Sequence, residues 1–243
     1  GFAHVSCLAE QAKILYAEAE ENNLDFKVLN ERWDRWHTCS LCEQQHYGVV
    51  RCALGWACWK TYLGRPETNQ LRGITLNLLG SGLSDAGLHE DAISIKEAEL
   101  SMKQRLGAPE EHILAAKGNL AIAYYHVGRF EDAVRLRQDA YSGYLKLKGE
   151  KHAKTLLAAS NYAESLRRLQ RFAEAKSLLR KTIPVTRRVC GENHEGTLKA
   201  RSFYAQALLQ DPSATVDDLR EAVTTLEDVA RIARRVLGGA HPL

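Results

Sequence analysis

The stretch GRFEDA at residues 128–133 recurs along the chain, and its recurrence indicates the fold. It stands again as QRFAEA at residues 170–175 and as GLHEDA at residues 87–92. Successive copies begin 41 and 42 residues apart. A near-constant period of this length is typical of repeat proteins, in which each unit buries its apolar face only against its neighbours.

Other elements keep the same period. Gly107 and Gly149 open two linkers that lie 42 residues apart, and a fourth copy opens at residues 190–194. About five residues are inserted in that copy around residues 211–213. Residues 237–242 repeat the start of the linker and open a fifth copy, so we expect the chain to be part of a longer polypeptide. Constant spacing over four copies favours a repeat array over a plain helical bundle.

Each copy predicts two helices joined by a tight turn. Apolar residues recur at helical spacing over residues 114–127 and again over residues 130–146. Gly128 stands between the two segments and tolerates the positive φ that a tight turn requires. Ala133 is small enough to let two helices approach closely. The sequence therefore predicts an all-α fold of stacked helix pairs.

The period and three motifs together resemble the tetratricopeptide repeats of kinesin light chains. The motifs are the Leu-Gly-x-x-His linker, Asn-x-Ala in the first helix and Gly-Arg-Phe-x-x-Ala at the turn. The resemblance covers residues 64–243. It implies a helical-hairpin solenoid, wound as a right-handed superhelix of about four repeats with a fifth truncated. It also implies that the first helices line a concave groove that captures a peptide or partner protein.

Polar residues recur at one position of the first helices and predict where such a partner binds. An Asn side chain can both donate to and accept from a peptide backbone. In the fourth copy the equivalent residue is Phe203, so the series of polar residues at this position ends there. A structural role, in which the Asn side chains cap or bridge adjacent helices, is the alternative. The candidate partner-binding residues are Asn77, Asn119, His126, Asn161 and Arg168.

Composition excludes several classes of protein. The chain has 45% hydrophobic and 26% charged residues, which are ordinary values for a folded protein, and its formal net charge is only +3. We therefore expect no nucleic acid partner. No apolar run approaches the about 18 residues of a membrane span, so we expect no span and a cytoplasmic location. No catalytic constellation is evident, and the chain by itself is not expected to be an enzyme.

Two Cys and His pairs near the start point to zinc. His4 and Cys7 form a His-x-x-Cys pair, and Cys39 and Cys42 form a Cys-x-x-Cys pair. Zinc prefers tetrahedral sulfur and imidazole ligands, and a two-residue gap lets both side chains of a pair reach one ion. A redox-active Cys-x-x-Cys is the alternative, but no βαβ pattern accompanies it. Two further candidate ligands are His37 and His46.

The segments at residues 1–8 and 36–48 resemble the second half of a RING-CH (RING-variant) zinc finger. His4 and Cys7 match the third ligand pair of that family, and Cys39 and Cys42 match the fourth. The resemblance implies that these pairs serve two different zinc ions. We therefore expect zinc in the intact protein but none tightly bound in this chain alone. It also implies recruitment of a ubiquitin-conjugating enzyme, which would make the intact protein an E3 ubiquitin ligase.

The sequence thus predicts three parts. Residues 1–48 form a partial zinc-finger-like segment with a helical insert, residues 49–63 a connecting and capping helix, and residues 64–243 the solenoid. The leading hypothesis is an interaction scaffold coupled to a RING-CH-like module for ubiquitin transfer. The alternative is a cargo or scaffold adaptor of the kinesin-light-chain type with no ubiquitin-ligase role.

Overall fold

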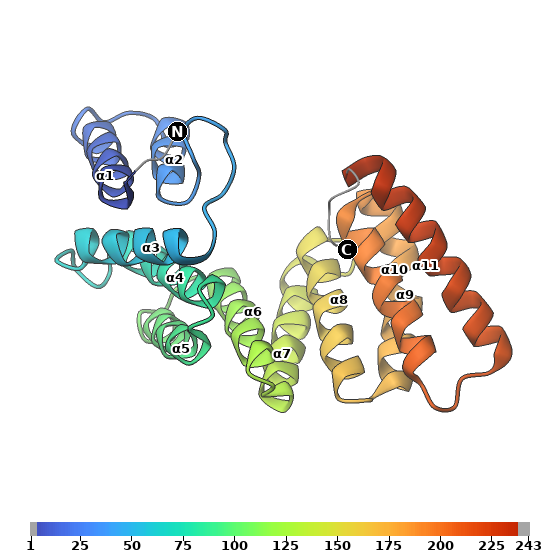
Figure 1. Ribbon diagram of the computed structural model, residues 1–243. Coiled ribbons are helices and arrows are strands. Elements are labelled where there is room, and N and C mark those ends of the chain that lie inside the picture. Colours follow the sequence, from blue (N-terminus) through green and yellow to red (C-terminus); the bar gives the residue numbers. More distant parts are fainter. Residues whose placement is uncertain (1–3, 238–243) are drawn as a thin grey trace. The chain divides into compact units, whose positions relative to one another are not determined.

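The computed structural model describes residues 4–237, and the regular elements in that range are all helices (Figure 1). An isolated β-bridge joins Thr38 to Gln45, and no β-strand occurs within the described range. The expected helical-hairpin repeats are therefore confirmed, whereas the opening of the fifth copy lies beyond residue 237. The chain divides into two compact units, residues 1–127 and residues 128–243. The expected three-part division stays a prediction.

The first unit holds six α-helices and one 3-10 helix in its described part. Their bounds are α1 Val5–Glu21, α2 Phe26–Trp33, η1 Asp34–Trp36, α3 Gly48–Tyr62, α4 Gln70–Asp85, α5 His89–Arg105 and α6 Glu110–His126. The backbones of α3 and α4 touch, because glycines stand at their crossing. A Cβ atom added to Gly82 would lie 2.7 Å from the carbonyl oxygen of Arg51. One added to Gly55 would lie 2.9 Å from Cα of Leu79.

Aromatic side chains join the N-terminal helices to α3. The Tyr16 ring lies 5.4 Å from that of Trp33 and 6.0 Å from that of Tyr62. Trp36 is fully buried beside Tyr62, at 6.1 Å between ring centroids. Residues 4–47 are therefore joined to α3 and α4 by a shared hydrophobic core.

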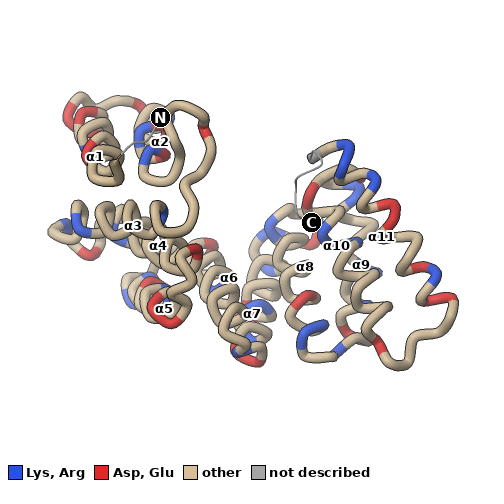
Figure 2. Tube along the Cα trace, viewed as in Figure 1, with Lys and Arg blue, Asp and Glu red and all other residues tan. Residues whose placement is uncertain are grey.

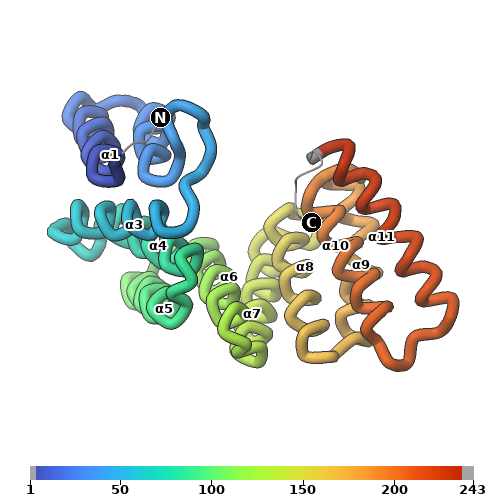
Figure 3. The backbone as a smooth tube through the Cα atoms, in the orientation of Figure 1, coloured from blue at the N-terminus to red at the C-terminus, as the bar shows by residue number. Residues whose placement is uncertain are grey.

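The second unit contains five helices in its described part (Figure 3). Their bounds are α7 Phe130–Lys148, α8 Ala153–Arg168, α9 Phe172–Cys190, α10 Glu195–Gln210 and α11 Val216–Leu237. Alanines that recur with the repeat let these helices pack closely: Ala133, Ala175 and Ala222 are all fully buried. The expectation that Ala133 permits close helix packing agrees with this burial.

Histidines of the linker motif start the first helices of this unit. Nδ1 of His152 accepts a hydrogen bond from the backbone N–H of Lys154, at 3.2 Å. Nδ1 of His194 accepts from Gly196 in the same way, at 3.1 Å. Each imidazole thereby satisfies one of the N–H groups that a helix start leaves without a partner. This role accounts for the linker histidines at residues 152 and 194, whereas the linker residue His112 lies inside α6.

The inserted residues of the fourth copy form an ordered connection. Oδ1 of Asp211 accepts from the backbone N–H of Ser213 at 2.9 Å, which closes an Asx turn. Oδ2 of Asp211 pairs with Lys176 on α9 at 2.6 Å. Thr215 and Asp218 then exchange side-chain and backbone hydrogen bonds at the start of α11.

Among residues 4–237, none of the helices is long and apolar enough to cross a bilayer.

Candidate functional site

In the second unit, α8 and α10 are each the first helix of a repeat. Together they form a face that contains a pocket of about 200 Å³. Leu156, Leu157 and Phe203 contribute its apolar wall. Asn161 lies beside them, and Lys154 and Lys199 also line the pocket. The structure thus brings one predicted residue, Asn161, together with Phe203, which ends the series of polar residues at the Asn position.

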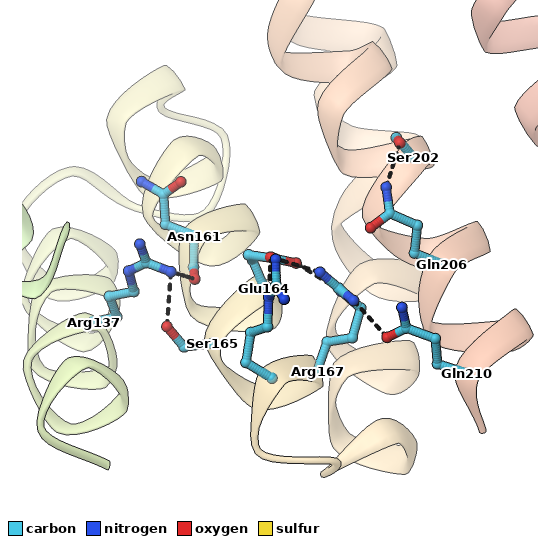
Figure 4. A network of polar contacts seen from close by, with 9 residues as sticks. Arg137, Asn161, Glu164, Ser165, Arg167, Ser202, Gln206 and Gln210 are labelled. Atoms are coloured by element: carbon cyan, nitrogen blue, oxygen red, sulfur yellow. Dashed lines mark hydrogen bonds and ion pairs between the residues drawn. The ribbon is translucent and has the colours of Figure 1, made fainter. Parts of the chain in front are cut away.

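Asn161 is held by its backbone and leaves its side-chain amide available. Its carbonyl oxygen accepts a hydrogen bond from Nη1 of Arg137 at 2.9 Å, and the same nitrogen donates to Oγ of Ser165 at 2.7 Å. Figure 4 shows the Asn161 amide pointing away from Arg137. No hydrogen bond of this amide occurs among the contacts of the described residues. The amide can therefore donate to and accept from a ligand backbone.

A buried ionic network lies further along α8. Glu164 pairs with Arg167 through both carboxylate oxygens at 2.7 Å, and Nε of Arg168 reaches the same carboxylate at 3.3 Å. Arg167 is almost fully buried, whereas the side chain of Arg168 is about half exposed. Nη1 of Arg167 donates to Oε1 of Gln210 on α10 at 2.5 Å. The predicted residue Arg168 thus lies at the exposed edge of a network that joins α8 to α10.

The equivalent residues of the first unit have different surroundings. Nδ2 of Asn77 donates to Glu99 of α5 at 3.4 Å, so this Asn bridges two helices. Glu99 is fully buried and also pairs with Lys103. Asn119 is half-buried on α6, with no side-chain hydrogen bond among those of the described residues. The bridging alternative therefore describes Asn77 but not Asn161.

His126 is part of a stacked pair of imidazoles. Its ring lies 5.3 Å from that of His89, with 9° between the ring planes. His126 is exposed, and Nδ1 of His89 is buried with no hydrogen-bond partner within the described part of the chain. The predicted residue His126 therefore packs on the start of α5, and part of its ring is exposed to solvent.

A second, wider pocket of about 450 Å³ lies in the first unit, between the starts of α4 and α6. Gly73 and Ala115 line it, at the repeat position where the second unit carries Leu157 and Lys199. The pocket of the first unit is therefore wider, because Gly73 and Ala115 have smaller side chains than Leu157 and Lys199. Predicted residues Asn77 and Asn119 are not among the residues that line this pocket.

The Cys and His pairs near the start lie outside both pockets. Cys39 and Cys42 are part of a tight turn closed by the Thr38–Gln45 bridge, and the backbone N–H of Leu41 points at Sγ of Cys39, at 3.5 Å. Hydrogen bonds from the backbone of Cys42 and Leu41 lower the pKa of the Cys39 thiol. Such a turn suits a metal-bound thiolate, but one pair supplies only two of the four ligands that zinc requires.

His4 and Cys7 do not complete that set. His4 is exposed and Nδ1 of its ring lies 2.6 Å from Oγ of Ser6, while the thiol of Cys7 is exposed. Within residues 4–237, no three His, Cys, Asp or Glu side chains are grouped so as to hold a metal ion. The described residues therefore do not fit a self-contained zinc site, and the zinc assignment stays a prediction.

Sequence reasoning missed three residues of the α8–α10 face: Lys154, Leu157 and Lys199. Leu157 and Lys199 lie one helical turn before the Asn position, where Gly73 and Ala115 stand in the earlier copies. The variation of this position between copies was the available signal. At this position Ala115, Leu157 and Lys199 are exposed, so the side chain varies between these copies without disturbing the core.

Comparison with known families settles the repeat type. A family model of the tetratricopeptide repeat matches residues 112–183 and, in a second overlapping match, residues 154–211. These segments are tetratricopeptide repeats. The α8–α10 face with its pocket lies inside the matched segments, whereas the RING-CH resemblance of residues 1–48 lies outside them and stays a prediction.

Solved structures with tetratricopeptide-like repeats share the fold along almost the whole chain. One contains the nearly identical TPR-like repeats assigned to a kinesin light chain of Podosopora anserina, with 18% identity and a TM-score of 0.62, over 96% of this chain and 98% of that one. A variant of that protein gives 18% identity and a TM-score of 0.64, over 98% and 99% of the two chains. BtubC (BKLC) from P. vanneervenii gives 16% identity and a TM-score of 0.65, over 100% and 95%. At these identities the likeness shows the fold alone. A search of curated proteins finds no match.

Proposed function

We propose that the chain is a protein–protein interaction scaffold that binds an extended peptide of its partner on the α8–α10 face. The observation that carries the proposal is the side-chain amide of Asn161, which lies without a partner among the described residues at the wall of a pocket. An extended peptide exposes backbone N–H and C=O groups, and one Asn amide can satisfy one of each.

The chemistry around Asn161 supports a peptide rather than a small metabolite. The pocket has an apolar wall of Leu157 and Phe203 for one side chain, and the amide lies beside it for the backbone. Each hydrogen bond of this kind contributes about 0.5–1.5 kcal/mol net. Affinity would therefore come from several such contacts along the face, and not from one deep cavity.

The proposal assigns different roles to the remaining predicted residues. The half-exposed side chain of Arg168 is assigned to peptide contacts on the α8–α10 face. Asn119 stands on a first helix of the other unit and is assigned to partner contacts of that unit alone. Asn77 is engaged by Glu99 at 3.4 Å, so we assign it a structural role. A cargo adaptor of the kinesin-light-chain type would use the same face, and the similarity of fold to such repeats supports this version equally.

Ubiquitin transfer is a separate addition to the proposal. It rests on the resemblance of the Cys39–Cys42 turn to a zinc-binding turn and on the accessibility of the Cys7 thiol. Its test is the metal content of the longest natural form of the protein, compared with that of a Cys39→Ser, Cys42→Ser variant. Loss of one zinc in the variant would support the module, and equal zinc in both forms would remove it.

The scaffold proposal is tested with a displayed library of random peptides. The wild-type chain should enrich a family of peptides, and Asn161→Ala should weaken the binding of individual enriched peptides by about tenfold, as expected from the loss of one or two hydrogen bonds. Asn77→Ala is the matched control and should leave peptide affinity unchanged. Failure of the wild-type chain to enrich any peptide would contradict the proposal.

A further inference from the structure

We propose that a groove between α7 and α9 binds a proline-rich segment of a partner, extended as a polyproline II helix and with an Asp or Glu beside the prolines. The groove has a volume of about 520 Å³ and lies between the second helices of two repeats, with α8 contributing its floor. None of the described residues that line it also lines the α8–α10 pocket. The inference therefore adds a second binding site to the function proposed above.

Two tyrosines form the aromatic part of the groove. The rings of Tyr141 on α7 and Tyr162 on α8 lie 6.2 Å apart between centroids, with 24° between their planes. Tyr162 is buried with Leu166 in one core cluster, and Tyr141 and Leu178 pack against that cluster. The aromatic surface is therefore fixed in place before a ligand binds. Proline-rich segments dock on aromatic grooves, because the polyproline II helix is already formed in the free ligand and loses little entropy.

The hydroxyl groups of the groove can donate hydrogen bonds to such a segment. The hydroxyls of Tyr141, Tyr162 and Ser177 have no hydrogen bond among those of the described residues. Burial raises the pKa of the Tyr162 hydroxyl, so this group keeps its proton at neutral pH. Proline has no N–H, and a proline-rich segment therefore presents mainly carbonyl oxygens, which accept hydrogen bonds. Donors in the groove and acceptors on the ligand are complementary.

Lys181 gives the groove a positive charge without a partner. It is exposed and forms no ion pair with any of the described residues. The carboxylate among the described lining residues belongs to Glu174, and Arg171 holds both of its oxygens, at 2.6 and 2.7 Å. An Asp or Glu beside the prolines of the ligand can therefore pair with Lys181 without competing with a carboxylate of the groove.

The charge of the whole unit also favours an acidic ligand. Residues 128–243 contain 21 Lys and Arg against 14 Asp and Glu, a net +7, whereas residues 1–127 contain 12 against 16, a net −4. Figure 2 marks these charges along the trace. A net positive unit attracts an acidic segment over long range and raises its association rate at low salt.

The length of the groove suits a short segment. Tyr141 and Lys181 also line a small cavity of about 20 Å³ that extends the groove to Leu145 and Val185. From Glu174 to Val185, α9 advances by about 16 Å, at about 1.5 Å per residue. A polyproline II helix covers this distance with about five residues, at about 3.1 Å each. Prolines at the tyrosines and an acidic residue at Lys181 therefore fit within one short segment.

The equivalent residues of α9 and α10 serve as an internal comparison. Ile183 stands one repeat after Tyr141, so the aromatic pair is not repeated there. Tyr204 stands one repeat after Tyr162, but its hydroxyl accepts a hydrogen bond from Nε of Arg180 at 2.8 Å. These residues therefore lack both the pair of rings and the unpaired hydroxyl.

The equivalent residues of α11 differ in the same sense. Asp228 stands where the preceding repeat has Lys181, which reverses the charge, and Arg201 binds this carboxylate. Thr224 stands where the preceding repeat has Ser177, and its hydroxyl donates to a backbone carbonyl of its own helix at 2.9 Å. Binding of a proline-rich segment is therefore expected at the α7–α9 groove and not at the equivalent surface of the next repeat.

The test uses the 243-residue chain and a displayed library of peptides in which two prolines are fixed as Pro-x-x-Pro. The wild type should enrich peptides that carry Asp or Glu beside the prolines, and replacement of both prolines by Ala should weaken an enriched peptide tenfold or more. Tyr141→Ile, which introduces the residue of the next repeat, should also weaken it tenfold or more, and Lys181→Glu about fivefold or more. The matched control is Lys60→Glu, an exposed charge reversal on α3, which should change affinity less than twofold.

Tyr141→Phe keeps the ring and removes only the hydroxyl, so it keeps the test valid if Tyr141→Ile unfolds the chain. It should weaken the same peptides about threefold to tenfold with an unchanged melting temperature. Asn161→Ala should leave their affinity unchanged, because Asn161 lines the other site. No enrichment by the wild type, full affinity of the Ala-substituted peptide, normal binding by Tyr141→Phe and Lys181→Glu, or loss of binding in Asn161→Ala would each overturn the second site. None of these outcomes would remove the scaffold function, which has its own library and its own variants.

Discussion

Arg167 and Glu164 form a bidentate ion pair inside the wall of the α8–α10 face, with both nitrogen–oxygen distances at 2.7 Å (Figure 4). Arg167 is only 4% exposed. Its remaining nitrogen, Nη1, donates to Gln210 on α10. One buried guanidinium thus connects two first helices, and its charge is balanced by a carboxylate from the preceding turn of its own helix.

Glu164→Gln should destabilise the protein by about 3–5 kcal/mol, because it leaves the buried Arg167 guanidinium without a compensating charge. Glu174→Gln is the matched control. Glu174 pairs with Arg171 at 2.6 Å, but both side chains are near half exposed, so the cost should stay within about 1 kcal/mol. Urea unfolding of the two variants measures both values. A loss of equal size in the two variants would mean that the buried pair contributes no more than an exposed one.

The double change of Asn119→Ala with Asn161→Ala should weaken partner binding by roughly ten- to a hundredfold while the melting temperature stays nearly unchanged. The reason is that neither amide has a hydrogen bond among those of the described residues, so their loss removes ligand contacts only. Affinity for a library-derived peptide and thermal unfolding are measured on one preparation. A lower melting temperature with intact affinity would contradict this role of the two Asn residues.

Asn77→Ala should behave in the opposite way. Removal of its amide takes a hydrogen bond from the fully buried carboxylate of Glu99, so stability should fall by about 1–3 kcal/mol with peptide affinity unchanged. Chemical denaturation gives the first quantity and the peptide titration the second.

Asp211 should make stability depend on pH in the acid range. Lys176 is the main cause that lowers the pKa of Asp211 to about 2, and Ser213 adds to the effect. The unfolded value is about 3.9, so the stabilisation is complete above about pH 4 and is lost as the pH falls towards 2. Unfolding of the wild type and of Asp211→Asn is compared across this range. Their difference should be largest near neutral pH and disappear near pH 2, and a constant difference would contradict the assignment.

Gln170→Gly should stabilise the protein by about 1 kcal/mol. Gln170 follows α8 with a φ of 57°, at the repeat position where Gly87 and Gly128 both have a φ of 78°. A side chain in this left-handed region costs about 1 kcal/mol or more, and glycine removes the cost. Thermal unfolding measures the gain. Gly128→Ala, the reverse exchange at the equivalent turn, should lower stability by a similar amount.

Gly82→Ala should destabilise the first unit by about 1–3 kcal/mol, because its methyl group would overlap the backbone of α3 at Arg51 and Cys52. Gly118→Ala on α6 is the control, since a Cβ there meets no atom within 4 Å. The control should gain about 0.5–1 kcal/mol from better helix propensity. Opposite signs of the two changes in urea unfolding would separate close packing from propensity.

The repeat, the helix pairs and the turns follow from the order of the amino acids alone. These features depend on local chemistry. Gly128 adopts the positive φ that a tight turn requires, and Ala133 is fully buried. A period of 42 residues repeats such local rules, and each repeat therefore folds in the same way as its neighbours. The His of the linker was visible as a motif, although its capping role was recognised only from the geometry of His152 and His194.

Which equivalent residues share a role depends on how the helices pack in three dimensions. Asn77 and Asn161 occupy the same repeat position, yet one is bound by Glu99 and the other faces a pocket. Glu99 is replaced by Ala140 and Thr182 at the equivalent positions, so a carboxylate partner stands in one copy alone. The role of a side chain on a repeat surface depends on residues of neighbouring helices, which lie far away in sequence and vary from copy to copy. That dependence is physical, because a hydrogen bond forms only where a partner lies within reach.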